Sequence, residues 1–422
     1  MISINDIRSK SEEIEQALKS KGYNGSIRDI AILDEDFRKI THSLEELRAK
    51  KNIVSEKVAI AKRNGENSKV EIEEMRALGD EIKSLELSSK ELKIKLFSEL
   101  EQIPNVPDHS VPVGEDEKDN VIIREWGDKP AFDFKVKSHI ELAKSLNLFD
   151  FKRGSKISGS GFPLYVGKGA ELERKIINSM IEHHVNKYNF IEMFPPVLLL
   201  EESMRTTGQL PKFKEDMYYS DLDELYLAPT AEVPITNVHR NEIIMESDLP
   251  IEYVAYSPCF RRESGSYGKD TRGLLRLHQF NKVEMVKFVK PSDSYKALEE
   301  LTLQAESILQ KLGIAYRVVE LCTGDLSFAA AKCYDIEIWS PGEQKWLEVS
   351  SCSNFEDYQA RRGKIRYRRE KDKKVDLLHT LNGSGLATPR LMVALLETYQ
   401  TADGRIQFSQ SAADFIGIKE LS

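Results

Sequence analysis

The fold of this chain is decided by the stretch Pro258-Cys259-Phe260-Arg261-Arg262-Glu263. A Gly- and Arg-rich loop follows it, and a second strand-like run then leads to Glu284. Residues two apart on a strand face the same side, so Arg261 and Glu263 are expected to point into one pocket. A guanidinium suits a phosphate, and a carboxylate suits the amino group of a base or of an amino acid. The hairpin therefore predicts a nucleotide site on an antiparallel sheet.

The chain has 422 residues, which favours two domains over one. Hydrophobic residues make up 40% and charged residues 31%, a soluble globular composition. The net charge of −8 argues against a protein that coats nucleic acid through its overall charge. Any contact with nucleic acid must therefore come from a local basic patch.

No signal peptide is expected at the N-terminus, and no run approaches the roughly 20 apolar residues that cross a bilayer. We therefore expect no membrane partner. The cysteines are Cys259, Cys322, Cys333 and Cys352, and none lies in a CxxC pair. They are interpreted as reduced thiols of a cytoplasmic protein.

The first hundred residues carry two helical patterns. Apolar residues recur at alternating steps of three and four over residues 37–61 and again over residues 75–96, with a polar break at Asn64-Gly65 between them. This spacing predicts an antiparallel helical hairpin. Helices of about 30 residues are roughly 45 Å long, so the hairpin is expected to project as an arm.

The two predicted arm helices differ in charge, and the first is the more basic one. Its candidate RNA-binding residues are Arg38, Arg48, Lys50, Lys51 and Lys57. Such a pattern is typical of a solvated coiled coil with balanced charges, and equally of a basic stripe along a phosphate backbone. Periodicity does not choose between the two interpretations.

Residues 103–130 are rich in proline and glycine and form the predicted linker into a second domain. Beyond it, strands are expected over residues 253–256, 281–288, 315–321 and 334–339, and helices over residues 172–188 and 391–399. Strands and helices do not alternate regularly. This favours an α+β domain with an antiparallel sheet over a doubly wound one.

Three polar segments stand among apolar ones in this domain: residues 230–232, 348–353 and 382–390. Taken singly, they fit a helix start, a strand end and a turn. Together they supply arginines, carboxylates and hydroxyls, which suit phosphate chemistry with Mg²⁺. The sequence contains no GxxxxGK[ST] loop and no GxGxxG motif opening a βαβ unit, so a P-loop or Rossmann site is not expected.

With these motifs in place, the chain resembles the bacterial-type seryl-tRNA synthetases, a class II aminoacyl-tRNA synthetase family, over essentially its whole length. Residues 260–284 look like the second class II motif, residues 383–390 like the third, and the helix ahead of residues 194–196 like the first, dimer-forming one. The resemblance becomes specific to the seryl enzymes when these motifs are combined with residues 206–213, residues 230–232, residues 104–108 and the N-terminal hairpin.

The resemblance implies a tRNA-binding helical arm over residues 1–105 and a class II catalytic domain over residues 106–422. It implies that serine and ATP form seryl-adenylate, and that the seryl group then passes to tRNA(Ser). Family members also serylate tRNA(Sec). A homodimer, with ATP as substrate and Mg²⁺ as cofactor, is expected on the same ground.

The resemblance also implies roles for single residues, with Arg261 and Arg390 as the catalytic pair on the α- and γ-phosphates. The residues implied at ATP are Arg261, Arg262, Glu263, Arg276, Phe280, Glu348, Val349, Ser350, Ser351 and Arg390, of which Glu348 and Ser351 would hold Mg²⁺. Those implied at serine are Thr230, Ala231, Glu232, Arg261, Glu284, Asn382 and Ser384. Those implied at tRNA are the five basic residues of the first arm helix.

Two positions depart from the family pattern. Pro389 stands where the family usually has glycine, and Glu171 reverses a charge ahead of the first motif. Proline suits the first turn of a helix, so Arg390 is expected to keep its place. Two alternatives to the ligase remain open: a class II-like paralogue that activates an amino acid for a carrier protein, and a coiled-coil binding protein with a degenerate catalytic domain.

Overall fold

A computed structural model covers residues 1–422 and describes all of them except residues 265–271. Most of the Gly- and Arg-rich loop expected after Glu263 therefore lies outside the described residues. The chain forms two compact units. The first contains Met1–Lys19 and Tyr23–Pro104, and the second contains Ser20–Gly22 and Asn105–Ser422.

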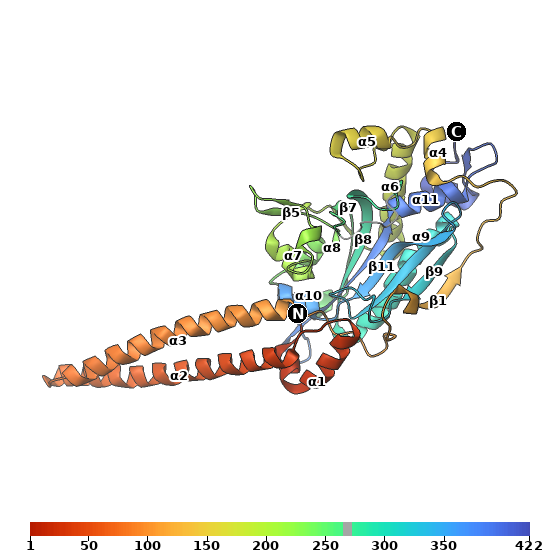
Figure 1. Cartoon of the computed structure of the whole chain (residues 1–422). Helices are drawn as coiled ribbons and strands as arrows, with labels where there is room; N and C mark the ends of the chain where they lie inside the picture. Colours follow the sequence, from red (N-terminus) through yellow and green to blue (C-terminus); the bar gives the residue numbers. More distant parts are fainter. Residues whose placement is uncertain (265–271) are drawn as a thin grey trace. The chain divides into compact units, whose positions relative to one another are not determined.

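The first unit contains one helix followed by the helical hairpin that the apolar spacing predicts, and the prediction of the hairpin is confirmed (Figure 1). Its helices are α1 (Ile4–Ser20), α2 (Ile27–Asn64) and α3 (Lys69–Glu101). Val54 and Val58 of α2 are buried against Leu78 of α3. Gly65, at a φ of 74°, ends α2 by donating its N–H to the carbonyls of Ala61 and Lys62.

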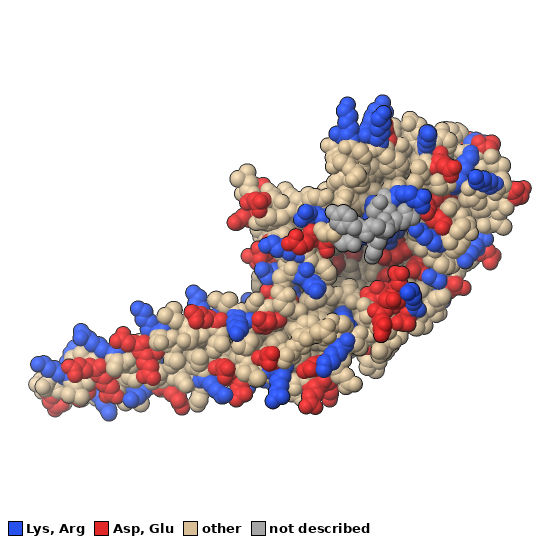
Figure 2. All heavy atoms as spheres, viewed as in Figure 1, with Lys and Arg blue, Asp and Glu red and all other residues tan. Residues whose placement is uncertain are grey.

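Acidic and basic side chains alternate along the visible face of the hairpin (Figure 2). Three of the predicted RNA-binding cations have carboxylate partners. Arg48 lies 2.6 Å from Glu86, Lys50 lies 3.4 Å from Glu74, and Arg38 lies 3.0 Å from the buried Asp34. These pairs fit a solvated coiled coil, and the RNA contact of the stripe stays a prediction.

An eight-stranded sheet organises the second unit, in the order β1-β9-β10-β11-β14-β8-β7-β2. Neighbouring strands are antiparallel except β2 and β7, which are parallel, so the predicted antiparallel α+β domain is confirmed. The strands are β1 (Val121–Trp126), β2 (Ile191–Met193), β7 (Ile251–Phe260), β8 (Gln279–Val289), β9 (Tyr316–Glu320), β10 (Lys332–Ser340), β11 (Lys345–Asn354) and β14 (His379–Ala387).

One face of the sheet carries the main apolar core. Val283 and Met285 of β8 point into it and pack with apolar residues of the covering helices. These helices are α6 (Lys168–Tyr188), α9 (Ser294–Leu312), α11 (Thr388–Thr398) and α12 (Gln410–Ile416). The helices predicted over residues 172–188 and 391–399 are found as α6 and α11.

The opposite face holds a smaller apolar cluster, to which the short helices α8 (Glu232–Thr236) and α10 (Tyr358–Gly363) contribute. Val286 and Phe288 of β8 belong to this cluster, so the even-numbered positions of β8 face it. Phe280, Lys282 and Glu284 therefore share this face, which is the one that carries the polar residues.

The remaining elements frame these layers. Three helices are α4 (His139–Ser145), α5 (Phe151–Ser158) and α7 (Glu201–Thr207). The small sheets contain β3 (Leu198–Leu199), β4 (Tyr219–Ser220), β5 (Leu225–Leu227), β6 (Ile243–Met245), β12 (Arg366–Arg368), β13 (Val375–Leu377), β15 (Ile406–Gln407) and β16 (Glu420–Leu421). Within the described ranges, no helix has both the length and the apolar character that crossing a membrane requires.

Candidate active site

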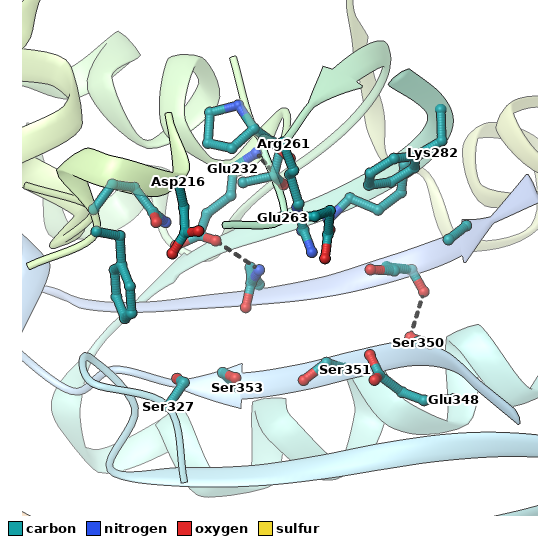
Figure 3. A pocket seen from close by; sticks show the side chains of 18 of the residues that line it. Asp216, Glu232, Arg261, Glu263, Lys282, Ser327, Glu348, Ser350, Ser351 and Ser353 are labelled. Atoms are coloured by element: carbon teal, nitrogen blue, oxygen red, sulfur yellow. Dashed lines mark hydrogen bonds between the residues drawn. The ribbon is translucent and has the colours of Figure 1, made fainter. Parts of the chain in front are cut away.

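A pocket of about 650 Å³ opens on the polar face of the sheet (Figure 3). It gathers segments that are up to 183 residues apart in the sequence, since both Thr207 and Arg390 line it. The sequence-predicted residues that line it are Thr230, Glu232, Arg261, Glu263, Arg276, Phe280, Glu348, Val349, Ser350, Ser351, Asn382, Ser384 and Arg390.

Three of the residues predicted at ATP or serine do not line this pocket. Ala231 is buried beneath it, and Arg262 is exposed, with its backbone N–H donated to the carbonyl of Asp216. Glu284 has no exposed surface, yet its carboxylate accepts hydrogen bonds from two side chains on the pocket wall, Asn382 and Ser384. Glu284 is therefore buried behind the pocket wall and contacts two of the side chains that form it.

Arg261 and Glu263 enter the same pocket, although the reason expected from the sequence is wrong. Strand β7 ends at Phe260, so both residues lie on the loop beyond it. The backbone of Glu263 has a φ of 53°, in the left-handed region that non-glycine residues rarely adopt. The Glu263 carboxylate accepts a hydrogen bond of 2.5 Å from Arg276 on the returning segment. This loop conformation, and not strand alternation, turns both side chains inward.

The Arg261 guanidinium is held on two sides. Its Nε donates to the carbonyl of Pro229 at 3.3 Å, and its centre lies 5.2 Å from the ring centroid of Phe280. Such a contact between a cation and an aromatic face orients the guanidinium and leaves its other N–H groups for an anion. Arg261 is therefore positioned to bind a phosphate.

Arg390 reaches the pocket from the start of α11. Pro389 occupies the first turn of this helix, where its missing N–H has no intrahelical role, and Arg390 lines the pocket. Its Nη1 donates to the backbone carbonyl of Glu348 at 2.7 Å and lies 3.3 Å from the Glu348 carboxylate. A second guanidinium thus faces the same cavity as Arg261.

Glu348 and Ser351 share one face of β11 because of a bulge. Glu337 pairs with Glu348, but Asp335 pairs with Ser351, so β11 has one extra residue between the two pairs. On a regular strand, positions three apart face opposite sides. The bulge places both oxygen donors on the pocket wall, where Figure 3 shows them together. A carboxylate beside a hydroxyl fits the preference of Mg²⁺ for oxygen ligands.

At the other end of the pocket, two carboxylates share one amide. Asn382 Nδ2 donates to Glu284 at 2.7 Å and to Glu232 at 3.0 Å. Gln359 Nε2 also donates to Glu232, at 2.7 Å. The buried Oδ1 of Asn382 has no hydrogen-bond partner among the described residues. A ligand with several N–H or O–H donors would satisfy this oxygen and both carboxylates.

The charge of Glu232 is sensitive to its surroundings. Burial, together with the nearby negative charge of Glu284, raises the pKa of the Glu232 carboxyl to about 7. The hydrogen bond from Gln359 acts in the opposite direction and favours the ionised form. A cation bound between the two carboxylates would therefore be attracted to both, and this end of the pocket suits an ammonium group.

Sequence reasoning missed two residues of this network. Lys282 lines the pocket, and its Nζ lies 2.6 Å from the Glu284 carboxylate. Its position two residues before Glu284, on the same strand face, is a signal that could have revealed it. Gln359 comes from α10, and nothing near it in the sequence connects it to Glu232.

A second cluster with metal-ligand chemistry lies away from these residues. Among the described residues, His139, Glu343 and Glu397 bring their polar atoms within 4.8 Å of one another. The Glu397 carboxylate already accepts the N–H and Nδ1 of His139, at 2.9 and 3.0 Å, and the N–H of Gly342. Nε2 of His139 receives the N–H of Leu274 at 3.3 Å. We interpret the cluster as a buried hydrogen-bond network that anchors the polypeptide.

Family models match both parts of the chain. A model described as the tRNA synthetase class II core domain (G, H, P, S and T) matches residues 213–399. A second model, described as the seryl-tRNA synthetase N-terminal domain, matches residues 1–107.

Curated proteins and solved structures agree with these models. The chain is 49% identical to a serine–tRNA ligase of Thermodesulfovibrio yellowstonii, with 99% of each chain covered. It is 50% identical to the serine–tRNA ligase of Chloroherpeton thalassium, with 100% of each covered. Among structures, the seryl-tRNA synthetase of Pyrococcus horikoshii complexed with ATP has a TM-score of 0.93 and 36% identity, covering 100% of this chain and 99% of that one. With such relatives over its full length and with both family models matched, the chain belongs to the seryl-tRNA synthetases of class II.

Proposed function

We propose that this chain converts L-serine and ATP to seryl-adenylate and pyrophosphate in the pocket on the polar face of the sheet, and then passes the seryl group to tRNA(Ser) with release of AMP. The enzyme class, a serine–tRNA ligase, follows from family membership. The observation that carries the proposal is the division of one pocket into two ends. Arg390 and Glu348 lie at one end, the shared carboxylates of Glu232 and Glu284 lie at the other, and Arg261 is close enough to Glu232 to interact with its charge.

The phosphate end accounts for activation. Arg261 would hold the α-phosphate, where negative charge accumulates while the serine carboxylate attacks, and Arg390 would hold the γ-phosphate of the departing pyrophosphate. Glu263 would accept the amino group of adenine, and Phe280 would stack on the ring. Arg276 orients Glu263 through its 2.5 Å hydrogen bond. The substrate carboxylate is ionised at neutral pH, so this step requires no general base.

Glu348 and Ser351 would hold Mg²⁺, whose charge would offset that of the nucleotide phosphates when bound. The side-chain oxygen of Ser350 is already committed, since it donates to the carbonyl of Ser384 at 2.7 Å. We propose that Val349 and Ser350 contribute to the ATP site through their place beside the bulge. The contacts of Arg262 with ATP and of Ala231 with serine stay predictions.

The serine end accounts for selectivity. Serine would place its ammonium between Glu232 and Glu284, and its hydroxyl near Thr230, Asn382 and Ser384. Such a polar subsite rejects an analogue without the hydroxyl by about 10⁴-fold, because its own groups would be left unpaired.

The N-terminal unit would bind tRNA. Lys51, Lys57 and the neighbouring basic residues of α2 would follow its phosphate backbone, although three of the five predicted cations also pair with carboxylates. tRNA(Sec), which shares the serylation step in the family, is proposed as a second RNA substrate.

A homodimer is proposed from an apolar face around β2 and β3. Phe194 is 82% exposed, and Leu198, Leu200 and Val238 are also exposed around a hollow beside them. A contiguous apolar surface of this kind is typical of a protein interface. We place the enzyme in the cytoplasm, in keeping with its four buried free cysteines.

The decisive experiment is serine-dependent exchange of pyrophosphate into ATP. We expect exchange with serine and little with alanine. No exchange, or faster exchange with another amino acid, would contradict the proposal. Charging of a tRNA(Ser) transcript, measured beside charging of a carrier protein, then tests the alternative of a carrier-loading paralogue. This alternative is not favoured, because the relatives match the N-terminal unit as well.

A further inference from the structure

The side chain of Lys282 is buried in the pocket wall, with 8% of its surface exposed. Its Nζ lies 2.6 Å from Oε2 of Glu284, which is itself fully buried. Lys282 and Glu284 share a face of β8, while Val283 between them points into the main core. A buried ammonium at this distance neutralises most of the charge of its partner.

The charged groups around this pair come from several elements. Lys282 and Arg261, which follows β7, both act electrostatically on Glu232 of α8, and the thiols of Cys259 on β7 and Cys352 on β11 lie near Glu284. The amino-acid end of the pocket therefore contains two carboxylates, and Lys282 is the cation in direct contact with one of them. With Lys282 present, the ammonium of one amino acid meets roughly one uncompensated carboxylate.

We propose that Lys282 is a specificity-determining residue of the serine subsite: its ammonium occupies one oxygen of Glu284 and thereby excludes amino acids that carry a second cationic group. The inference rests on the proposed function. Selectivity often depends on such a repulsive element as much as on attractive contacts. Without Lys282, Glu284 would keep its hydrogen bonds from Asn382 and Ser384 but would lose its ammonium partner, so the same space would suit a ligand with two ammonium groups.

The test compares serine with 2,3-diaminopropionate, which has an amino group where serine has its hydroxyl. Lys282→Met removes the charge and keeps most of the unbranched side chain, and Lys282→Arg keeps the charge. Lys287→Met is the matched control. Lys287 lies on the same strand, is also buried, and is 2.6 Å from Glu252, but it does not line the pocket.

Pyrophosphate exchange gives kcat/KM for both amino acids. We expect Lys282→Met to shift the ratio of the two values at least ten-fold toward 2,3-diaminopropionate, with the KM for ATP changed less than two-fold. Lys282→Arg and Lys287→Met should keep the wild-type ratio within about three-fold.

An unchanged ratio in Lys282→Met, with both substrates weakened equally, would overturn the inference and leave Lys282 a structural role. If Lys282→Met does not fold, as judged by thermal unfolding, Lys282→Gln is measured against the same criterion. Failure of the wild-type enzyme to exchange with serine would instead refute the proposed function, so the two failures are distinguishable.

Discussion

Lowering the pH from 8 to 6 should raise the KM for serine about ten-fold, through the carboxyl group of Glu232. The pKa of this buried carboxyl is raised to about 7 by burial and by Glu284. The ammonium of serine attracts the ionised form, so serine binding must release a proton wherever Glu232 is protonated beforehand. The effect is therefore about two-fold at pH 7, grows as the pH falls further, and fades above about pH 8.

The magnitude follows from the pKa of Glu232. A carboxyl group with a pKa of about 7 is about 9% ionised at pH 6 and about 90% ionised at pH 8. If only the ionised form accepts the ammonium, the apparent affinity for serine changes by the same ratio, about ten-fold. The groups facing Glu232 are Glu284, Lys282, Arg261 and the amides of Gln359 and Asn382.

The assay is pyrophosphate exchange at varied serine between pH 5.5 and pH 8.5. Glu232→Gln is the control, because glutamine has nearly the same shape and does not titrate. Dividing the wild-type KM by that of Glu232→Gln at each pH removes the contributions of ATP and of other groups. A ratio that stays constant from pH 6 to pH 8 would show that Glu232 is already ionised in the free enzyme, and would refute the reasoning.

Three further predictions concern the arm, the nucleotide and the fold. Deletion of residues 35–98 should abolish charging of tRNA(Ser) and leave pyrophosphate exchange within about two-fold; charging that survives would contradict an RNA-binding arm. Phe280→Ala should raise the KM for ATP about ten-fold, the upper range for a lost aromatic stack, with the KM for serine unchanged; equal changes in both would argue against stacking on adenine. Glu397→Ala should lower the free energy of unfolding, measured by urea titration, by about 3 kcal/mol. The substitution leaves the N–H groups of His139 and Gly342 without their acceptor. A loss below about 1 kcal/mol would show that the network is dispensable for stability.

Regular patterns made much of the fold predictable. The steps of three and four in residues 37–61 and 75–96 predict helices because a helix buries one stripe, and Val54, Val58 and Leu78 are indeed buried along it. The period of two on β8 likewise separates Val283 and Met285 from Glu284. Each of these patterns lies within one segment, so the sequence of that segment is enough to recognise it.

The parts that could not be predicted depend on local irregularity or on distant contacts. The bulge that turns Glu348 toward Ser351 is visible only in the pairing of β11 with β10. The left-handed backbone of Glu263 is set by its loop. Alternation along a strand predicts the correct pocket for this side chain, but the residue lies beyond the end of the strand, so the loop conformation is the actual cause. Gln359 meets Glu232 across 127 residues of chain, and no spacing rule connects them.

The charged residues of the pocket pair with one another, which explains how a folded protein can hold so many charges at one site. Arg390 contacts Glu348, Arg276 contacts Glu263, and Lys282 contacts Glu284. An isolated charge in such a site would be costly, whereas paired charges compensate much of the loss of hydration. In two of these pairs the proposed ligand groups have the opposite sign to the residue they meet: a phosphate for Arg390 and an ammonium for Glu284. Substrate binding would therefore exchange one set of ion pairs for another, and affinity would depend on the difference between the two sets. The sign of a residue's charge does not by itself define its role in this pocket, because the residue that it pairs with determines how much of that charge the substrate encounters.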